Sequence, residues 1–452
     1  MRRLLQPAGL RRSLIRTEPT HHPDPEDGLR RGGKGVDGQP VTHAPPPDKG
    51  FVARPASIGD APNQLSDLRV IWVSPSYGYG GDLLYFKGLF TTFCKRFPQT
   101  RIMVDPDVRY READGIPLVP KLTGWVVKRT RQVGGASYDA SVHVPSPWFV
   151  AQLRALRPDA VVAIEFTLVS LAALALAGFS KRFAVLLLIE SNPAARGGKA
   201  HGLALTVKRW ACKRADAIQT SNEAGRRFLI DQLNVDPKKI RVAPYLTSSP
   251  PRPAFRSKPA QDGKLRILFA NSLTARKGPH ALLDALALLP YAVAERIDLT
   301  FVGDGPERAS LERQAAILSG PQVRFVGAKS YSSLGEYYQQ ADVLAVPSLA
   351  DYRSLAGFEG LSYGLALLAS TADGASTETL DSGRTGIAID PADPASIADA
   401  IRQLAEQPEF LSSCQINAAD LFEKRFSFDR ITDSLAASLM AARTAFLAEK
   451  KR

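Results

Sequence analysis

The sequence has few cysteines, the residues that cross-link disulfide-stabilised scaffolds. Among its 452 residues are only three cysteines, Cys94, Cys212 and Cys414, which lie far apart and form no C-x-x-C pair. This spacing argues against a disulfide framework and against a zinc site made of thiolates, and it fits a reducing compartment.

Several catalytic motifs are missing as well. The chain has no G-x-x-x-x-G-K-[ST] phosphate loop and no G-x-S-x-G nucleophile elbow. His143, His201 and His280 show no metal-ligand spacing. The one D-x-D, Asp105-Pro-Asp107, could be a metal-binding pair, but an isolated example beside proline is typical of a turn. We therefore expect neither a resident metal nor a cofactor.

Long apolar runs are also absent. The best, Leu171 to Phe179, ends at Lys181-Arg182 and falls short of the roughly 18 residues that a membrane-spanning helix needs. The arginines near the amino terminus have no apolar segment behind them, so we expect no signal peptide and a cytoplasmic location.

Composition divides the chain into segments. Residues 1–65 hold 10 of the 33 prolines and no hydrophobic period, which predicts a disordered, basic, Pro/Gly-rich extension. Ordered patterns then predict a first domain at 66–248, a Pro/Ser-rich linker at 249–263 and a second domain at 264–428. The remaining residues, 429–452, predict a helix that packs back toward the first domain.

The positive charge belongs to the first folded half. Residues 66–250 have 26 basic and 14 acidic side chains, whereas residues 251–452 have 22 and 24. Such a field attracts an anionic leaflet or a phosphorylated substrate. Basic residues beside Trp125 and Trp210 suit an interfacial patch on a membrane surface. Aromatic residues are not interleaved with them as in RNA-binding signatures, so we expect no nucleic-acid partner.

The second half alternates short apolar strands with helices of about ten residues. Strands are expected at 265–270, 298–302, 323–326, 342–346, 365–370 and 386–389. This pattern predicts right-handed βαβ units on a parallel sheet, and ligands bind such sheets at the carboxyl ends of the strands. The expected fold is α/β, with two Rossmann-like parallel-sheet domains facing across a cleft.

The segment 341–365 is the richest in chemistry. A buried strand ends at Pro347, and a helix is expected to start near Ser354, where unpaired amides and the helix dipole suit a phosphate. Asp351 precedes this helix end, and Glu359 lies eight residues further, about 12 Å along a helix. Carboxylates that far apart could hold hydroxyls at the two ends of a long ligand with phosphate between them.

The loop 271–278 follows the first strand of the second domain. Its Arg276 and Lys277, at a strand's carboxyl end in a loop that ends in glycine, could clamp a diphosphate. The next strand leads into the turn Gly303–Arg308, whose glycines allow positive φ and whose proline suits a helix start.

Taken in order, these segments resemble family 4 retaining glycosyltransferases of GT-B fold, the glycosyl transferases group 1. Gly303–Arg308 is similar to the family's G-x-G-P-E-R turn, Val323–Gly327 to its V-x-F-x-G, and Asp342–Ser348 to its A-D-V-x-x-x-P-S. Ser370–Glu378 resembles the loop after its P-V-V-A-S strand. The resemblance runs from about residue 68 to 440 and is more specific in the second half.

The resemblance implies roles for individual residues. Arg276 and Lys277 match the residues that neutralise the donor diphosphate. Glu359 matches the second glutamate of E-x7-E, which holds the ribose hydroxyls. Asp351 stands where the first glutamate contacts the transferred sugar, one methylene shorter. The backbone of Ser354 and Leu355 would bind the distal phosphate.

Five further positions complete the implied donor site. The base would lie near Gly327 and Ala328, and Gly80 and Gly81 match a first-domain loop that closes over the donor. Ser272 stands where the family often has an arginine.

The expected function is transfer of a hexose from a nucleoside-diphosphate sugar, with retention and without metal, to a glycan or lipid-linked acceptor. Surface polysaccharide or glycolipid synthesis at the inner face of the cell membrane would fit. Two alternatives stay open: a nucleotide-sugar epimerase or hydrolase of the same fold, and a non-catalytic basic binding protein.

Overall fold

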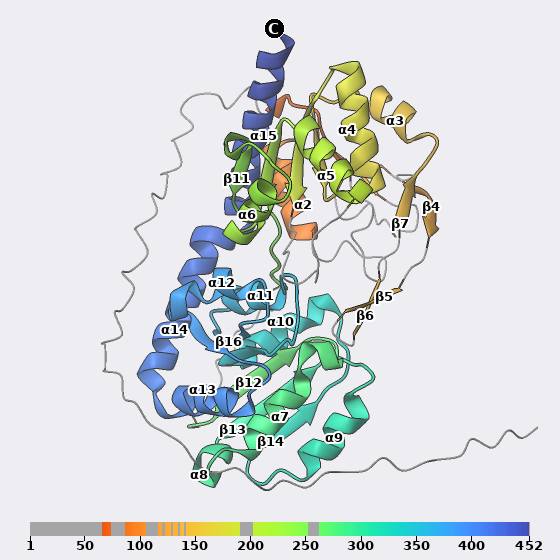
Figure 1. Cartoon of the computed structure of the whole chain (residues 1–452). Coiled ribbons are helices and arrows are strands. Elements are labelled where there is room, and N and C mark those ends of the chain that lie inside the picture. Colours follow the sequence, from red (N-terminus) through yellow and green to blue (C-terminus); the bar gives the residue numbers. More distant parts are fainter. Residues whose placement is uncertain are drawn as a thin grey trace, which may run out of the picture. The chain divides into compact units, whose positions relative to one another are not determined.

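The structure is a computed structural model, and the residues that it describes all belong to one compact unit, Asp60–Arg452 (Figure 1). The residues described are 66–73, 86–104, 116–119, 123–127, 130–133, 136–139, 142–189, 202–251 and 262–451. The predicted extension 1–65, Gly80, Gly81 and most of the predicted linker lie outside these ranges.

The first lobe is built on a seven-stranded parallel sheet with strand order β11-β10-β9-β8-β1-β2-β3. Its strands are near-continuous apolar runs because helices cover both faces of such a sheet. The strands are β1 (Val70–Val73), β2 (Arg101–Met103), β3 (Leu118–Val119), β8 (Ala160–Ile164), β9 (Ala184–Ile189), β10 (Ala217–Thr220) and β11 (Ile240–Val242). The helices are α2 (Lys87–Arg96), α3 (Phe149–Ala155), α4 (Leu168–Ser180), α5 (Gly202–Arg214) and α6 (Glu223–Asp231).

Two antiparallel ribbons belong to the same part of the chain. One pairs β4 (Thr123–Val127) with β7 (Val142–Pro145), and the other pairs β5 (Thr130–Val133) with β6 (Ala136–Asp139).

The second lobe is built on a six-stranded parallel sheet with order β14-β13-β12-β15-β16-β17. Its strands are β12 (Leu265–Ala270), β13 (Ile297–Val302), β14 (Gln322–Phe325), β15 (Val343–Val346), β16 (Ala366–Ser370) and β17 (Gly386–Ile389). Its α-helices are α7 (Pro279–Ala287), α8 (Tyr291–Ala294), α9 (Arg308–Ala316), α10 (Tyr331–Gln340), α11 (Ala356–Ser362), α12 (Ser376–Thr379), α13 (Pro394–Glu406) and α14 (Pro408–Leu421).

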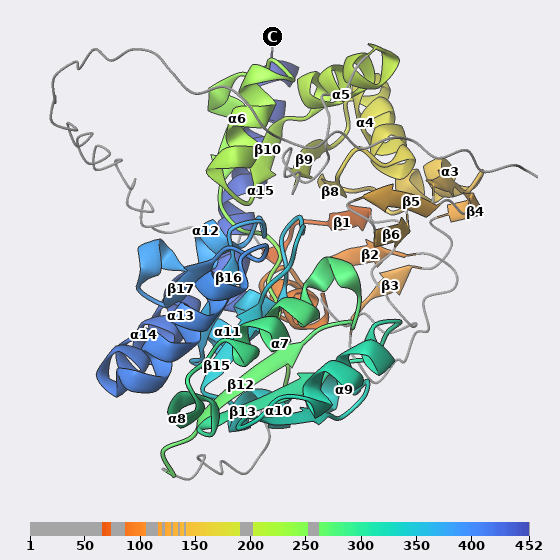
Figure 2. The same cartoon turned by 60° about the horizontal axis from the view of Figure 1, so that its bottom comes forward.

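Figure 2 shows the strands and helices that build the second lobe. Alternation along each strand divides the interior of this lobe into two cores. Ile267 and Phe269 of β12 pack with α7, α9 and α13, whereas Leu268 between them packs with α10, α11 and α14. Successive strand side chains point to opposite faces, so a single apolar strand serves both cores. The predicted architecture of two parallel α/β sheets is confirmed.

The last helix, α15 (Phe428–Lys450), leaves the second lobe and packs on the first. A π-helical turn, Phe422–Phe426, precedes it. Ile431, Leu435 and Leu439 are buried in one core with Trp72 of β1. Their spacing of four places them on one face of the helix.

Candidate functional site

The order of the second sheet defines a switch point between β12 and β15. From β12 the chain adds β13 and β14 on one side, and then crosses over to add β15, β16 and β17 on the other. Ligands of open α/β sheets bind at such a point, outside the carboxyl ends of the strands. Here the two loops that meet at the switch point are 271–278 and 347–355, the segments that carry the three predicted catalytic residues.

The three predicted catalytic side chains meet at this point. Lys277 Nζ lies 2.5 Å and Arg276 Nη1 lies 2.9 Å from the same oxygen, Asp351 Oδ2. Arg276 also donates to the carbonyl of Ala350 at 3.2 Å. Lys277 is only 8% exposed, so its charge is poorly screened by water. Two cations share one carboxylate, which leaves the group with a net positive charge.

Lys277 also influences two further carboxyl groups. Burial opposes ionisation of Asp351, but Lys277 and Arg276 outweigh it and hold the pKa of Asp351 below its usual value. Burial raises the pKa of both Asp373 and Glu359, and the charge of Lys277 opposes each rise. Asp373 follows β16 and was not predicted to belong to the site. The sequence feature that could have indicated a site residue here is its position just after a strand and directly before glycine.

Glu359 differs from its predicted setting. Only Ala356–Ser362 are helical, so the estimate of 12 Å along a continuous helix from Asp351 is wrong. Glu359 is 5% exposed, its Oε1 accepts from Ser248 Oγ at 2.7 Å, and its Oε2 accepts from Tyr338 Oη. A ribose diol bound by Glu359 would therefore replace protein hydroxyls that hold it here.

The predicted helix end also lies elsewhere. Helix α11 begins at Ala356, two residues later than expected, and the amide of Ser354 donates to Asp373 Oδ1 at 3.0 Å. A phosphate at that amide would have to exchange with Asp373. Leu355 packs against the cores of both lobes.

The predicted base site is organised by backbone contacts. The amide of Gly303 donates to the carbonyl of Gly327 at 3.0 Å. A Cβ on Gly303, whose φ is +147°, would collide with the carbonyl of Asn271, so only glycine lets these loops approach so closely. Ser272 and Ala328 are exposed beside them.

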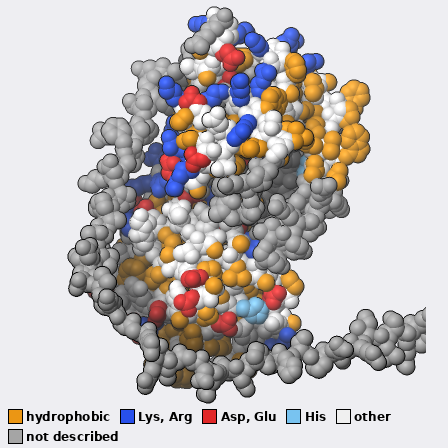
Figure 3. Space-filling view, in the orientation of Figure 1, with side chains coloured by type: hydrophobic (Ala, Val, Ile, Leu, Met, Phe, Trp, Pro, Cys, Tyr) orange, Lys and Arg blue, Asp and Glu red, His pale blue; other side chains and the backbone are white. Residues whose placement is uncertain are grey.

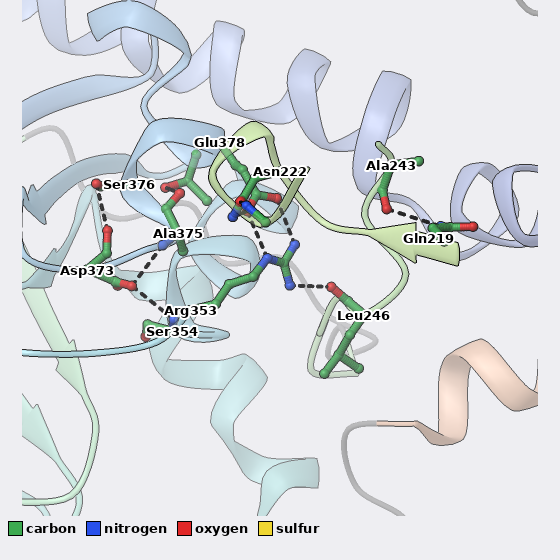
Figure 4. Close-up of polar contacts among 12 residues, drawn as sticks. Gln219, Asn222, Ala243, Leu246, Arg353, Ser354, Asp373, Ala375, Ser376 and Glu378 are labelled. Atoms are coloured by element: carbon green, nitrogen blue, oxygen red, sulfur yellow. Dashed lines mark hydrogen bonds and ion pairs between the residues drawn. The ribbon is translucent and has the colours of Figure 1, made fainter. Parts of the chain in front are cut away.

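A second polar cluster joins the two lobes, and the sequence did not predict it (Figure 4). Arg353 forms an ion pair with Glu378 of α12 and donates to the carbonyl of Leu246 in the first lobe. Asn222, before α6, donates to the same glutamate. No local sequence signal indicated it, because its members come from segments far apart in the chain.

Two negative findings concern the described residues alone. None of their helices is both long and apolar enough to cross a membrane. Among them, no three His, Cys, Asp or Glu side chains are grouped closely enough to hold a metal ion.

Comparison with solved structures shows the same fold. The structure of Anabaena HepE in complex with UDP covers 83% of this chain and 100% of its own, with a TM-score of 0.62 and 17% identity. Sucrose-phosphate synthase of Thermosynechococcus elongatus covers 82% of this chain and 99% of its own, with a TM-score of 0.60 and 17% identity.

Curated relatives match over part of their length. D-inositol 3-phosphate glycosyltransferase of Geodermatophilus obscurus is 28% identical over 254 residues, which are 53% of this chain and 55% of that protein. Alpha-D-kanosaminyltransferase of Streptomyces kanamyceticus is 23% identical over 52% of this chain and 62% of its own. The chain thus spans about half the length of the curated relatives it matches.

Two family models match successive parts of the chain. The glycosyl transferase 4-like domain matches residues 91–245, which hold most of the first sheet. Glycosyl transferases group 1 matches residues 252–421, which hold the whole second sheet and the cluster around Asp351. With its two parallel sheets, the chain is a member of the family 4 glycosyltransferases of GT-B fold, glycosyl transferases group 1.

Proposed function

We propose that this chain is a retaining glycosyltransferase that moves a hexosyl group from a nucleoside-diphosphate sugar to a hydroxyl of a glycan or lipid-linked acceptor, in surface polysaccharide or glycolipid synthesis. The convergence of Arg276, Lys277 and Asp351 at the switch point carries the proposal. A uridine donor has support from the fold neighbour HepE, whose structures hold UDP and UDP-glucose.

The chemistry follows from the charges. When the bond between the sugar and the diphosphate breaks, negative charge develops on the leaving oxygen, and Arg276 and Lys277 stabilise it in place of a metal. Asp351 stays ionised because its pKa is lowered, so it can accept a hydrogen bond from a sugar hydroxyl. The acceptor hydroxyl attacks from the face that the diphosphate leaves, and its proton goes to the departing phosphate.

We assign binding of the acceptor to the first lobe, and we propose that this lobe docks on the anionic cytoplasmic leaflet of the membrane. Trp125 and Trp148 are 62% and 70% exposed, and Val127 pairs with Val142 across the β4–β7 ribbon, where both are exposed. Figure 3 shows apolar side chains gathered over this part of the molecule, with Lys and Arg side chains near them. Flotation with anionic and neutral vesicles tests this, and no binding to anionic vesicles at low salt would contradict it.

A small phosphorylated polyol is the second candidate acceptor. The D-inositol 3-phosphate glycosyltransferases among the relatives favour it, and so does the net positive charge of residues 66–250. Product analysis with D-inositol 3-phosphate, set beside a lipid-linked glycan acceptor, separates the two candidates.

A thermal-shift screen with UDP, GDP, ADP and TDP tests the donor, because a ligand that binds only the folded state raises the melting temperature. The matching sugar nucleotide is then incubated with and without acceptor. A glycosylated product with retained anomeric configuration supports the proposal. Free sugar or an epimerised donor alone would favour the hydrolase or epimerase, and no shift with any diphosphate would contradict a donor site.

A further inference from the structure

Arg353 is a buried cation that donates hydrogen bonds to acceptors in both lobes. Its side chain is 1% exposed, and its Nε and Nη2 donate to the two oxygens of Glu378 at 2.9 and 3.0 Å. Its Nη1 donates to the carbonyl of Leu246 at 2.7 Å. The guanidinium lies over the ring of Phe358, 4.1 Å from the centroid. Only a planar fork of donors can serve these partners together.

The first lobe also reaches the carboxylate of this pair. Asn222 Nδ2 donates to Glu378 Oε1 at 3.2 Å, while Asn222 Oδ1 accepts from the amide of Gly225 and caps α6. Figure 4 shows Asn222 and Leu246 approaching the Arg353–Glu378 pair from the first lobe. We call Arg353, Glu378, Asn222 and the Leu246 carbonyl the interlobe clamp.

Arg353 of the clamp lies within the loop that carries Asp351. Arg353 is two residues from Asp351, whose strand bridge to Asp373 joins the loops after β15 and β16. Asp373 Oδ1 in turn accepts the amides of Ser354 and Ala375. Both loops are thus tied to each other and, through Arg353 and Glu378, to the first lobe. Movement of the clamp would move the carboxylate that pairs with Arg276 and Lys277.

We propose that Arg353 is a positioning residue that sets the place of Asp351 and of the distal phosphate relative to the first lobe. The proposal rests on the proposed function, because it assigns to the clamp the geometry of the donor's sugar and outer phosphate. The proposed ribose ligand, Glu359, is held by Ser248 and Tyr338. The proposed base site is the loop 327–328. Neither contains a residue of the clamp.

The first test uses hydrogen exchange of the full-length protein without ligand. Arg353→Lys keeps the charge but cannot form the fork, and Asn222→Asp keeps the α6 cap while placing a second carboxylate against Glu378. We expect amides of residues 349–354 to exchange at least tenfold faster in both variants. The matched control, Asn417→Asp, loses an amide donor to the Arg384 carbonyl inside the second lobe and leaves that exchange unchanged.

The second test compares UMP with UDP-glucose by calorimetry. In Arg353→Lys we expect UDP-glucose to bind at least tenfold more weakly and UMP to bind within twofold of the wild type. Equal weakening of both would mean a general structural role and would overturn the proposal.

Hydrogen exchange tests the role of the clamp independently of the donor's identity. If the wild type bound neither nucleotide, the proposal of a uridine donor would be wrong, and hydrogen exchange would still test whether the clamp positions residues 349–354. Unchanged exchange at 349–354 in both variants would overturn it. Should Arg353→Lys fail to fold, Asn222→Asp carries the test, because it leaves the buried ion pair intact.

Discussion

Replacing Lys277 with methionine removes one charge from the proposed diphosphate site and keeps most of the side-chain volume. Lys277 Nζ lies 2.5 Å from Asp351 Oδ2, and its charge reaches Glu359 and Asp373 as well. Two unit charges about 4 Å apart interact by about 4 kcal/mol at an effective dielectric constant near 20. Arg276 remains and compensates in part. We therefore expect turnover to fall at least 100-fold, which is about 2.7 kcal/mol of barrier.

The assay measures nucleotide release and glycosylated product with a saturating donor, at a temperature where the variant is folded. Lys264→Met is the matched control, since Lys264 pairs with a different carboxylate of the same lobe, Asp298, at 3.7 Å. We expect that control to be nearly silent. The pKa of Asp351 should also rise in Lys277→Met, because its strongest stabilising charge is gone. Turnover within twofold of the wild type, in a folded variant, would refute the phosphate role of Lys277.

Three further predictions concern stability, measured by chemical denaturation. Burial raises the pKa of Asp216 to about 6, so the stability it contributes is complete below about pH 4 and is lost as pH rises through 6; Asp216→Asn should flatten that fall. Gly278 has φ +68° and a Cβ there would collide with the carbonyl of Pro347, so Gly278→Ala should cost more than the about 1–2 kcal/mol of Gly383→Ala, whose φ is +86° in open space. Leu435→Ala should cost about 2–5 kcal/mol, because that side chain is buried where α15 meets the first sheet. The account of Asp216 is contradicted if stability falls with pH as steeply in Asp216→Asn as in the wild type. The account of Gly278 is contradicted if Gly278→Ala and Gly383→Ala lose equal stability. The account of Leu435 is contradicted if Leu435→Ala loses less than about 1 kcal/mol of stability.

The second lobe was predictable because each of its strands is a short apolar run between helix signals. The expected strands 265–270 and 386–389 coincide with β12 and β17. Strand β10 (Ala217–Thr220) was missed, since it is short and half polar, although Gln219 in it is fully buried. Helix α14 was missed because Pro408 interrupts the pattern, whereas in the structure that proline stands in the first turn of a new helix.

The candidate site was predictable in part for a physical reason. Neighbouring parallel strands bring their carboxyl ends together, so the loops with Lys277 and Asp351 had to meet. The direct pairing of Lys277 with Asp351 could not be predicted. The spacing of Asp351 and Glu359 along the sequence suggested that a ligand lies between these two carboxylates, whereas the structure places Asp351 against two cations. The contacts of Arg353 with Leu246 and of Asn222 with Glu378 join segments more than 100 residues apart, and no local pattern encodes them.

The most direct test of the central claim is a crystal structure of the protein with UDP bound. The account predicts an oxygen of the outer phosphate at hydrogen-bond distance, about 3 Å, from Lys277 Nζ and within reach of the Arg276 guanidinium. A diphosphate bound away from the loops 271–278 and 347–355, with Lys277 still paired to Asp351 alone, would contradict it.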